Sequence, residues 1–179
     1  MEHPNGIRIR DGYMYVTQST LEKVKTESGN LASCVYRFAL DDHDIAITNT
    51  LDDPNIFATF ETKNPACQYG VDGIVFDHNG DLLIGNFGEV YRLKIGPDGS
   101  LLENKPWAKN PEELKSTDGM TIDANGNIYI ADFSANAIVR VSPDGEVRRI
   151  AQSPDTDGFH GELDEPGEPC IWDGRIIVS

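Results

Sequence analysis

The stretch DGMTIDANGNIYIADF (Asp118–Phe133) repeats the pattern of DGIVFDHNGDLLIGNF (Asp72–Phe87). Gly73 and Gly119 are 46 residues apart, and two further pairs of turn glycines keep the same separation. Repeats of this length with strand-like content are typical of β-propeller blades, which are small antiparallel sheets that bury their faces against neighbouring blades. The sequence therefore predicts an all-β chain, in which copies of one sheet surround a shared axis.

Each copy carries its own strand and turn signals. IVFD and MTID are expected as the inner strands, and DLLIGNF and NIYIADF as the second strands. The segments that follow alternate apolar and polar residues, as a half-exposed third strand does. Dipeptides that favour tight turns separate these strands; they are Asn79-Gly80, Asn125-Gly126, Asp98-Gly99 and Asp144-Gly145.

Two less regular copies flank the clear ones. HPNGIRIRDGYMYVTQS (His3–Ser19) has Asn-Gly where the later copies have Asp-Gly, and GEPCIWDGRIIVS (Gly167–Ser179) is a shortened last copy. The first copy is longer than the others, which predicts surface loops at Thr20–Asn30 and Asp41–Asn55. Such loops often shape the entrance to a ligand site.

The chain is predicted to form one partial β-propeller domain over residues 1–179. We expect blades at about 1–69, 70–115 and 116–165, and the start of another at 166–179. At about 45 residues per blade, the length allows three to four blades in an open arc. The missing blades would come from the rest of a longer chain or from a second copy. We favour the longer chain, because unpaired blade edges promote aggregation.

Charge and hydropathy exclude several classes of partner. The net charge of −15 argues against binding to nucleic acid or to an anionic membrane surface. No apolar run approaches the roughly 18 residues of a membrane span. The first residues, MEHPNGIRIRDG, do not resemble a secretory signal, and the sequence does not predict a compartment.

The three cysteines show no CxxC spacing, which argues against a zinc site or a disulfide framework. A bridge between Cys34 and Cys67 is one alternative. Buried free thiols at Cys34, Cys67 and Cys170 are the favoured interpretation.

Oxygen-bearing side chains recur at the start of each predicted inner strand. They are Asn5, Asp72, Asp118 and Glu168. In a propeller these positions surround one mouth of the channel, so that like charges converge unless a cation neutralises them. Carboxylate and amide oxygens are the ligands that Ca²⁺ prefers, which predicts a divalent metal site. The alternative is that Asn-Gly and Asp-Gly serve only as turn formers.

The segments PNGI, DGMTIDANGNIYIADFSANAIVRVSPDG and GEPCIW resemble the regucalcin/gluconolactonase/luciferin-regenerating-enzyme family of six-bladed propellers. The resemblance implies one divalent metal, often calcium, at the channel mouth, and lactone hydrolysis. By motif, the metal ligands of the family correspond to Glu168, Asn5 and Asp118. The Glu segment follows the Asp here, whereas in the family it is usually near the N-terminus. Asp72 is a second match for the Asp, because it lies in the copy after Asn5.

The expected function is therefore metal-dependent hydrolysis of a lactone, with a small molecule, a lactone or a sugar-derived compound, as the substrate. The resemblance implies an Asp as general base; Asp118 is favoured and Asp72 is second. No GxSxG, GxGxxG or GxxxxGK[ST] motif indicates another chemistry. The alternative function is a non-catalytic propeller that binds a ligand or a protein.

Several other residues are left outside the predicted site. DANGNIYIAD is interpreted as a hairpin, because its glycine does not have the position that an EF-hand loop requires. Asn86 and Asp132 end equivalent strands and are expected to bond to neighbouring turns. The four histidines lack metal-binding spacing, and His3 is expected at the surface or in a turn.

Overall fold

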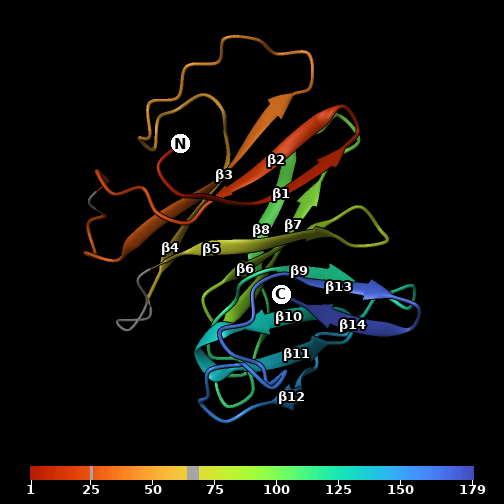
Figure 1. Cartoon of the computed structure of the whole chain (residues 1–179). Coiled ribbons are helices and arrows are strands. Elements are labelled where there is room, and N and C mark those ends of the chain that lie inside the picture. Colours follow the sequence, from red (N-terminus) through yellow and green to blue (C-terminus); the bar gives the residue numbers. More distant parts are fainter. Residues whose placement is uncertain (25, 64–68) are drawn as a thin grey trace.

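The computed structural model describes residues 1–24, 26–63 and 69–179. Four antiparallel sheets follow one another along the chain, and the strands of each sheet lie in chain order (Figure 1). Within the described residues, no helix is long and apolar enough to cross a membrane. The first sheet contains β1 (Pro4–Arg10), β2 (Tyr13–Gln18), β3 (Leu31–Ala39) and β4 (Ile56–Thr62).

The second and third sheets are the two clear copies of the sequence repeat. Both have four strands; the inner strand of the second sheet begins one residue before its Asp-Gly dipeptide, and that of the third begins just after it. The second sheet contains β5 (Val71–Phe76), β6 (Leu82–Asn86), β7 (Glu89–Ile95) and β8 (Leu101–Lys109). The third contains β9 (Met120–Ile122), β10 (Ile128–Asp132), β11 (Ala137–Val141) and β12 (Val147–Gln152), with the short 3-10 helix η1 (Phe133–Ala135) after β10.

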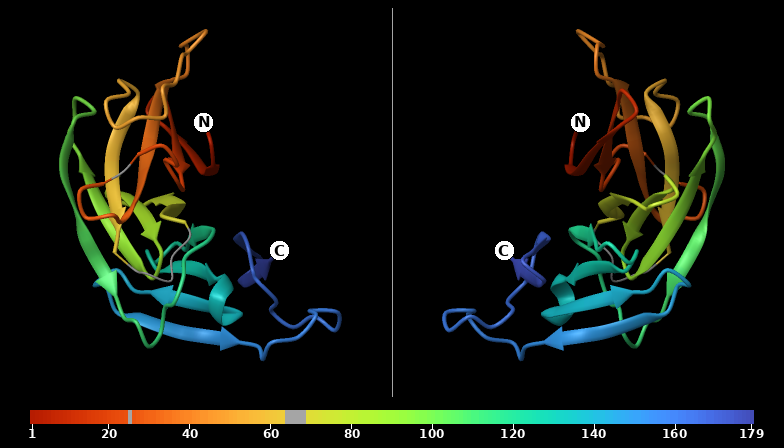
Figure 2. Two further views of the ribbon diagram at one scale, coloured as in Figure 1. Left: turned by 90° about the vertical axis from the view of Figure 1, so that its left-hand side faces the viewer. Right: turned by 90° about the vertical axis from the view of Figure 1, so that its right-hand side faces the viewer.

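The fourth sheet is the hairpin of β13 (Pro169–Trp172) and β14 (Arg175–Val178). The four sheets follow a crescent, with β1 and β13 toward its concave side (Figure 2). Three complete sheets and the beginning of another confirm the predicted arc of three to four propeller blades.

The turn between β9 and β10 is a hairpin, as predicted. Asp123 Oδ1 accepts the backbone N–H groups of Asn125 (2.9 Å) and Asn127 (2.8 Å). Gly126 has a φ of 85°, a conformation that glycine adopts without steric cost. The equivalent Asp77 accepts two backbone N–H groups of the turn between β5 and β6. The repeated aspartates therefore close turns, and the calcium-loop interpretation is not needed.

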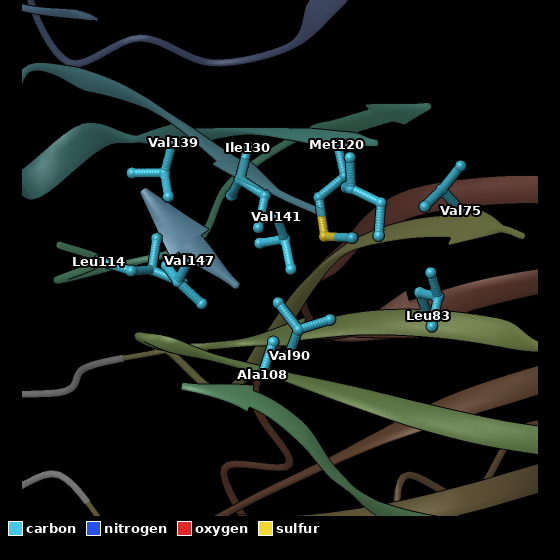
Figure 3. Packing of buried hydrophobic residues seen from close by; sticks show 11 residues of the cluster. Val75, Leu83, Val90, Ala108, Leu114, Met120, Ile130, Val139, Val141 and Val147 are labelled. Atoms are coloured by element: carbon cyan, nitrogen blue, oxygen red, sulfur yellow. The ribbon is translucent and has the colours of Figure 1, made fainter. Parts of the chain in front are cut away.

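Neighbouring sheets bury apolar side chains against each other, which is how a propeller blade obtains its core. Between the first and second sheets, Tyr15, Val35 and Phe60 pack with Ile74 and Leu82. Figure 3 shows the core between the second and third sheets, which Leu114 joins from the connection after β8. Its labelled members are Val75, Leu83, Val90, Ala108, Leu114, Met120, Ile130, Val139, Val141 and Val147.

The first sheet is also covered on the face that points away from the second sheet. Cys34 and Tyr36 alternate with Val35 along β3, so they lie on this other face, and both are fully buried. Leu21 packs there from the connection before β3, and Ile47 from the connection before β4. The long loops predicted from the sequence therefore supply an apolar layer for the first sheet.

The cysteines follow the prediction only in part. Cys34 is free and buried, and burial raises the pKa of its thiol to about 12. Cys170 is free but exposed, so its predicted burial is wrong. It lies in the two-stranded fourth sheet, where Trp172 and Ile177 are also exposed. Cys67 lies outside the described residues, and the structure does not address a bridge to Cys34.

We predict that Leu21→Ala lowers the free energy of unfolding by about 2–4 kcal/mol, because it leaves a cavity under the first sheet. Leu21 is 2% exposed. Urea denaturation measures the change. The control is Leu51→Ala, since Leu51 is 48% exposed; its expected cost is below about 0.5 kcal/mol. Equal costs for the two variants would show that the loop does not pack against the sheet.

Candidate functional site

Glycines at the starts of the inner strands bring the predicted site residues close together. A β-carbon at each glycine would collide with the backbone of the predicted site residue that follows in the chain, at the next inner strand. A side chain therefore has no space there. Inner strands β1, β5, β9 and β13 are in contact in this order (Figure 1). The collisions would be Gly6 with the Asp72 carbonyl oxygen (2.8 Å), Gly73 with the Asp118 carbonyl oxygen, and Gly119 with Glu168 Cα (2.7 Å).

Three of the four predicted residues line one cavity of about 310 Å³. Asn5 is exposed at its edge, Asp118 is partly buried, and Asp72 is 7% exposed. Among the described residues, the lining consists of His3, Pro4, Asn5, Ser19, Tyr69, Asp72, Asp118 and Phe133.

Asp72 is the most strongly perturbed acid of the site. Burial, together with the nearby Asp118 and Glu168 carboxylates, raises the pKa of its carboxyl from 3.8 to about 8. Its Oδ1 is buried without a hydrogen-bond partner. The backbone of Asp72 is fixed, because Thr17 Oγ1 of β2 donates to its carbonyl oxygen at 2.7 Å. A carboxyl group with one unpartnered oxygen is thus held on a fixed backbone, largely away from water.

Asp118 lies beside Asp72 at the start of the third sheet. Burial raises the pKa of its carboxyl, the Gly119 N–H opposes this shift, and Glu168 adds to it. The turn before Asp118 is fixed by Asp132, whose Oδ1 accepts both the N–H (3.0 Å) and the Oγ–H (2.7 Å) of Ser116. This supporting role of Asp132 agrees with the expectation that it bonds to a neighbouring turn.

Glu168 is close to Asp118 but does not line the cavity. Its Oε1 pairs with Arg8 Nη2 at 3.2 Å, and its side chain is 57% exposed. Arg8 also donates to the Met120 carbonyl oxygen at 2.8 Å, so that one cation from the first sheet reaches both the third and the fourth. The structure therefore brings Asn5, Asp72 and Asp118 together at one cavity and places Glu168 beside Asp118, where it pairs with Arg8.

The donors in the cavity fit a hard cation. Among the described residues, no three His, Cys, Asp or Glu side chains gather closely enough to hold a metal ion. What the cavity offers is two neighbouring carboxylates and the Asn5 amide, all oxygen donors. A divalent cation would supply the partner that Asp72 Oδ1 lacks and offset the repulsion between the acids.

Sequence reasoning missed five residues of the cavity. His3 was expected at the surface or in a turn; it is partly exposed, lies at the cavity and pairs with Glu22 at 2.6 Å. Phe133 could have been found from the repeat, because it matches Phe87, and their rings are in contact. Pro4, Ser19 and Tyr69 are not marked by the repeat in this way.

We predict that the stability of the cation-free protein falls as the pH rises from about 4 to 8. The pKa of Asp72 is higher in the folded state than the usual 3.8. In this interval the unfolded chain therefore releases a proton that the folded chain retains, and rising pH favours unfolding. Asp72→Asn removes this effect and should raise the free energy of unfolding at pH 8 by about 2–5 kcal/mol. Urea denaturation at both pH values measures it; parallel pH profiles for the two proteins would contradict the prediction.

Comparison with known proteins adds a family relationship to this geometry. A family model described as the SMP-30/Gluconolactonase/LRE-like region matches residues 88–158. The matched segment extends from the second sheet through all of the third. A comparison with curated protein sequences found no match.

Solved structures with the same fold include proteins of different activities. A gluconolactonase from Xanthomonas campestris is 15% identical, with a TM-score of 0.61 over 100% of this chain and 54% of that chain. The calcium-binding protein regucalcin from Agrobacterium tumefaciens is 14% identical, with a TM-score of 0.62 over 98% and 52%. A virginiamycin B lyase from Staphylococcus aureus is 19% identical, with a TM-score of 0.54 over 99% and 48%.

The chain spans about half the length of these structures. At this level of identity the likeness establishes the fold, and the fold hosts more than one chemistry. Together with the family match, it confirms the resemblance seen in the sequence. Residues 88–158 match the SMP-30/Gluconolactonase/LRE-like region, and the chain has the fold of about half of the propellers to which it is similar.

Proposed function

We propose that this chain contributes the metal-binding and catalytic residues of a lactone hydrolase. The observation that carries the proposal is the buried Asp72 carboxyl, whose Oδ1 has no hydrogen-bond partner, beside Asp118 in one cavity. Such an arrangement destabilises the free protein, which makes a purely structural role a poor explanation. The family match and the gluconolactonase and regucalcin structures support a calcium-dependent hydrolase of this kind.

Asn5, Asp72 and Asp118 would hold the cation, with Ca²⁺ as the expected ion because all three donors are oxygens. Once bound, the cation supplies Lewis-acid polarisation of the lactone carbonyl and makes a nearby water more acidic. Asp72 is best suited to a permanent ligand, since it is buried and its backbone is fixed by Thr17.

Asp118 is better placed than Asp72 to act as the general base. It is partly buried and lines the cavity, so a water molecule can reach its carboxylate. Asp118 would take a proton as the water oxygen forms a bond to the carbonyl carbon. The ring C–O bond then breaks, its electron pair stays on the ring oxygen, and that oxygen receives the proton. The product is an open-chain hydroxy acid.

We predict that Asp118→Asn lowers kcat for lactone hydrolysis about 10²–10⁴-fold with calcium present, because the amide cannot accept the proton. Steady-state kinetics above the spontaneous rate measure the change. Asp173→Asn, in the exposed turn between β13 and β14, is the matched control and should leave kcat unchanged.

Thermal unfolding with calcium or with a chelator distinguishes this function from the alternative. Calcium should raise the melting temperature of the parent and have less effect on Asp72→Asn. A protein that hydrolyses no lactone and melts at the same temperature under both conditions would instead be a non-catalytic binding module.

A further inference from the structure

Beyond the predicted ligands, the described cavity wall combines rings with a few polar groups. Three of the other five lining residues are Pro4, Tyr69 and Phe133. Tyr69 is 47% exposed, and Phe133 is supported by Phe87, with ring centroids 6.2 Å apart. Among the described residues, no lysine or arginine lines the cavity. A wall of this kind favours an apolar group on the ligand.

Ser19 carries the one buried side-chain hydroxyl among the described residues that line the cavity. Ser19 is 3% exposed, and its Oγ has no hydrogen-bond partner. Its backbone is held at both ends, because its N–H donates to the His3 carbonyl (2.9 Å) and its carbonyl accepts from the Gly70 N–H (2.6 Å). A buried hydroxyl without a partner destabilises the free protein, and a ligand oxygen in the cavity would satisfy it.

The other described polar side chains of the cavity are those of His3, Asn5, Tyr69, Asp72 and Asp118. Asn5, Asp72 and Asp118 are assigned to the cation, and His3 already pairs with Glu22. A polyhydroxylated lactone would bring several hydroxyl groups against Pro4 and Phe133, where each would lose its hydration without a replacement. A ligand with few polar atoms avoids this cost.

We propose that the substrate is a lactone with a hydrocarbon substituent, rather than a sugar-derived lactone, and that Ser19 positions it. The substituent lies against Tyr69 and Phe133, and the Ser19 hydroxyl donates to one ligand oxygen. This inference rests on the proposed function, because the lactone must also reach the cation held by Asp72 and Asp118.

The test compares three six-membered lactones with the calcium-loaded protein: δ-nonalactone, unsubstituted δ-valerolactone and glucono-δ-lactone. We expect kcat/KM for δ-nonalactone to exceed that for each of the other two at least about tenfold, and Phe133→Ala to reduce this preference. A preference for glucono-δ-lactone would overturn the proposal. If no lactone is hydrolysed, the proposed function fails, and calorimetric titration with the same three compounds still measures the preference of the cavity.

Ser19→Ala separates positioning from a structural role. We expect KM for δ-nonalactone to rise about fivefold or more, with the melting temperature unchanged or higher, because an unsatisfied hydroxyl has been removed. Thr20→Val is the matched control, since Thr20 Oγ1 is also buried and unpartnered but Thr20 does not line the cavity. It should leave KM unchanged. A lower melting temperature for Ser19→Ala with an unchanged KM would overturn the role of Ser19.

Discussion

The candidate site depends on how closely the inner strands of neighbouring sheets approach each other. At Gly6, Gly73 and Gly119 the backbone of the next sheet occupies the space that a side chain would need. Sheet packing fixes these close contacts between strands. It therefore also fixes the positions of the residues that precede the glycines, which are Asn5, Asp72 and Asp118. Thr17 shows how tight the junction is: its hydroxyl bonds to the backbone of Gly6 in its own sheet and of Asp72 in the next. The position of the acids is therefore a consequence of the blade architecture.

That architecture imposes an electrostatic cost where the sheets converge. Asp72 and Asp118 share a cavity, and burial raises the pKa of both. Arg8 relieves part of the negative charge by pairing with Glu168, which leaves the two aspartates without a cation of their own. Ser19 Oγ and Asp72 Oδ1 are both unpartnered at the same cavity. Unfavourable groups that gather at one place are a common sign of a site arranged for a ligand.

Much of this could be predicted from the sequence, because the repeat carries most of the structural information. The 46-residue period fixes the strands, the Asp- and Asn-bearing turns and the row of acids in the second and third sheets. Features outside the repeat could not be predicted. Leu21 and Ile47 cover the first sheet from irregular loops, and the Arg8–Glu168 pair joins sheets that are distant in sequence. The exposure of Cys170 was also missed. Alternation along β13 shows which residues share a face of the hairpin, but it does not show whether another part of the chain covers that face.

The most direct test of this account is a carbon-detected NMR titration of the Asp72 side-chain carboxyl, with and without calcium. The account predicts that in the cation-free protein this group titrates with a pKa of about 8. With calcium bound, it should remain ionised over the whole interval from pH 5 to 9, at about the same carbon shift. A pKa near the usual value for aspartate without calcium, or an identical titration curve in its presence, would contradict the claim that Asp72 is a buried cation ligand.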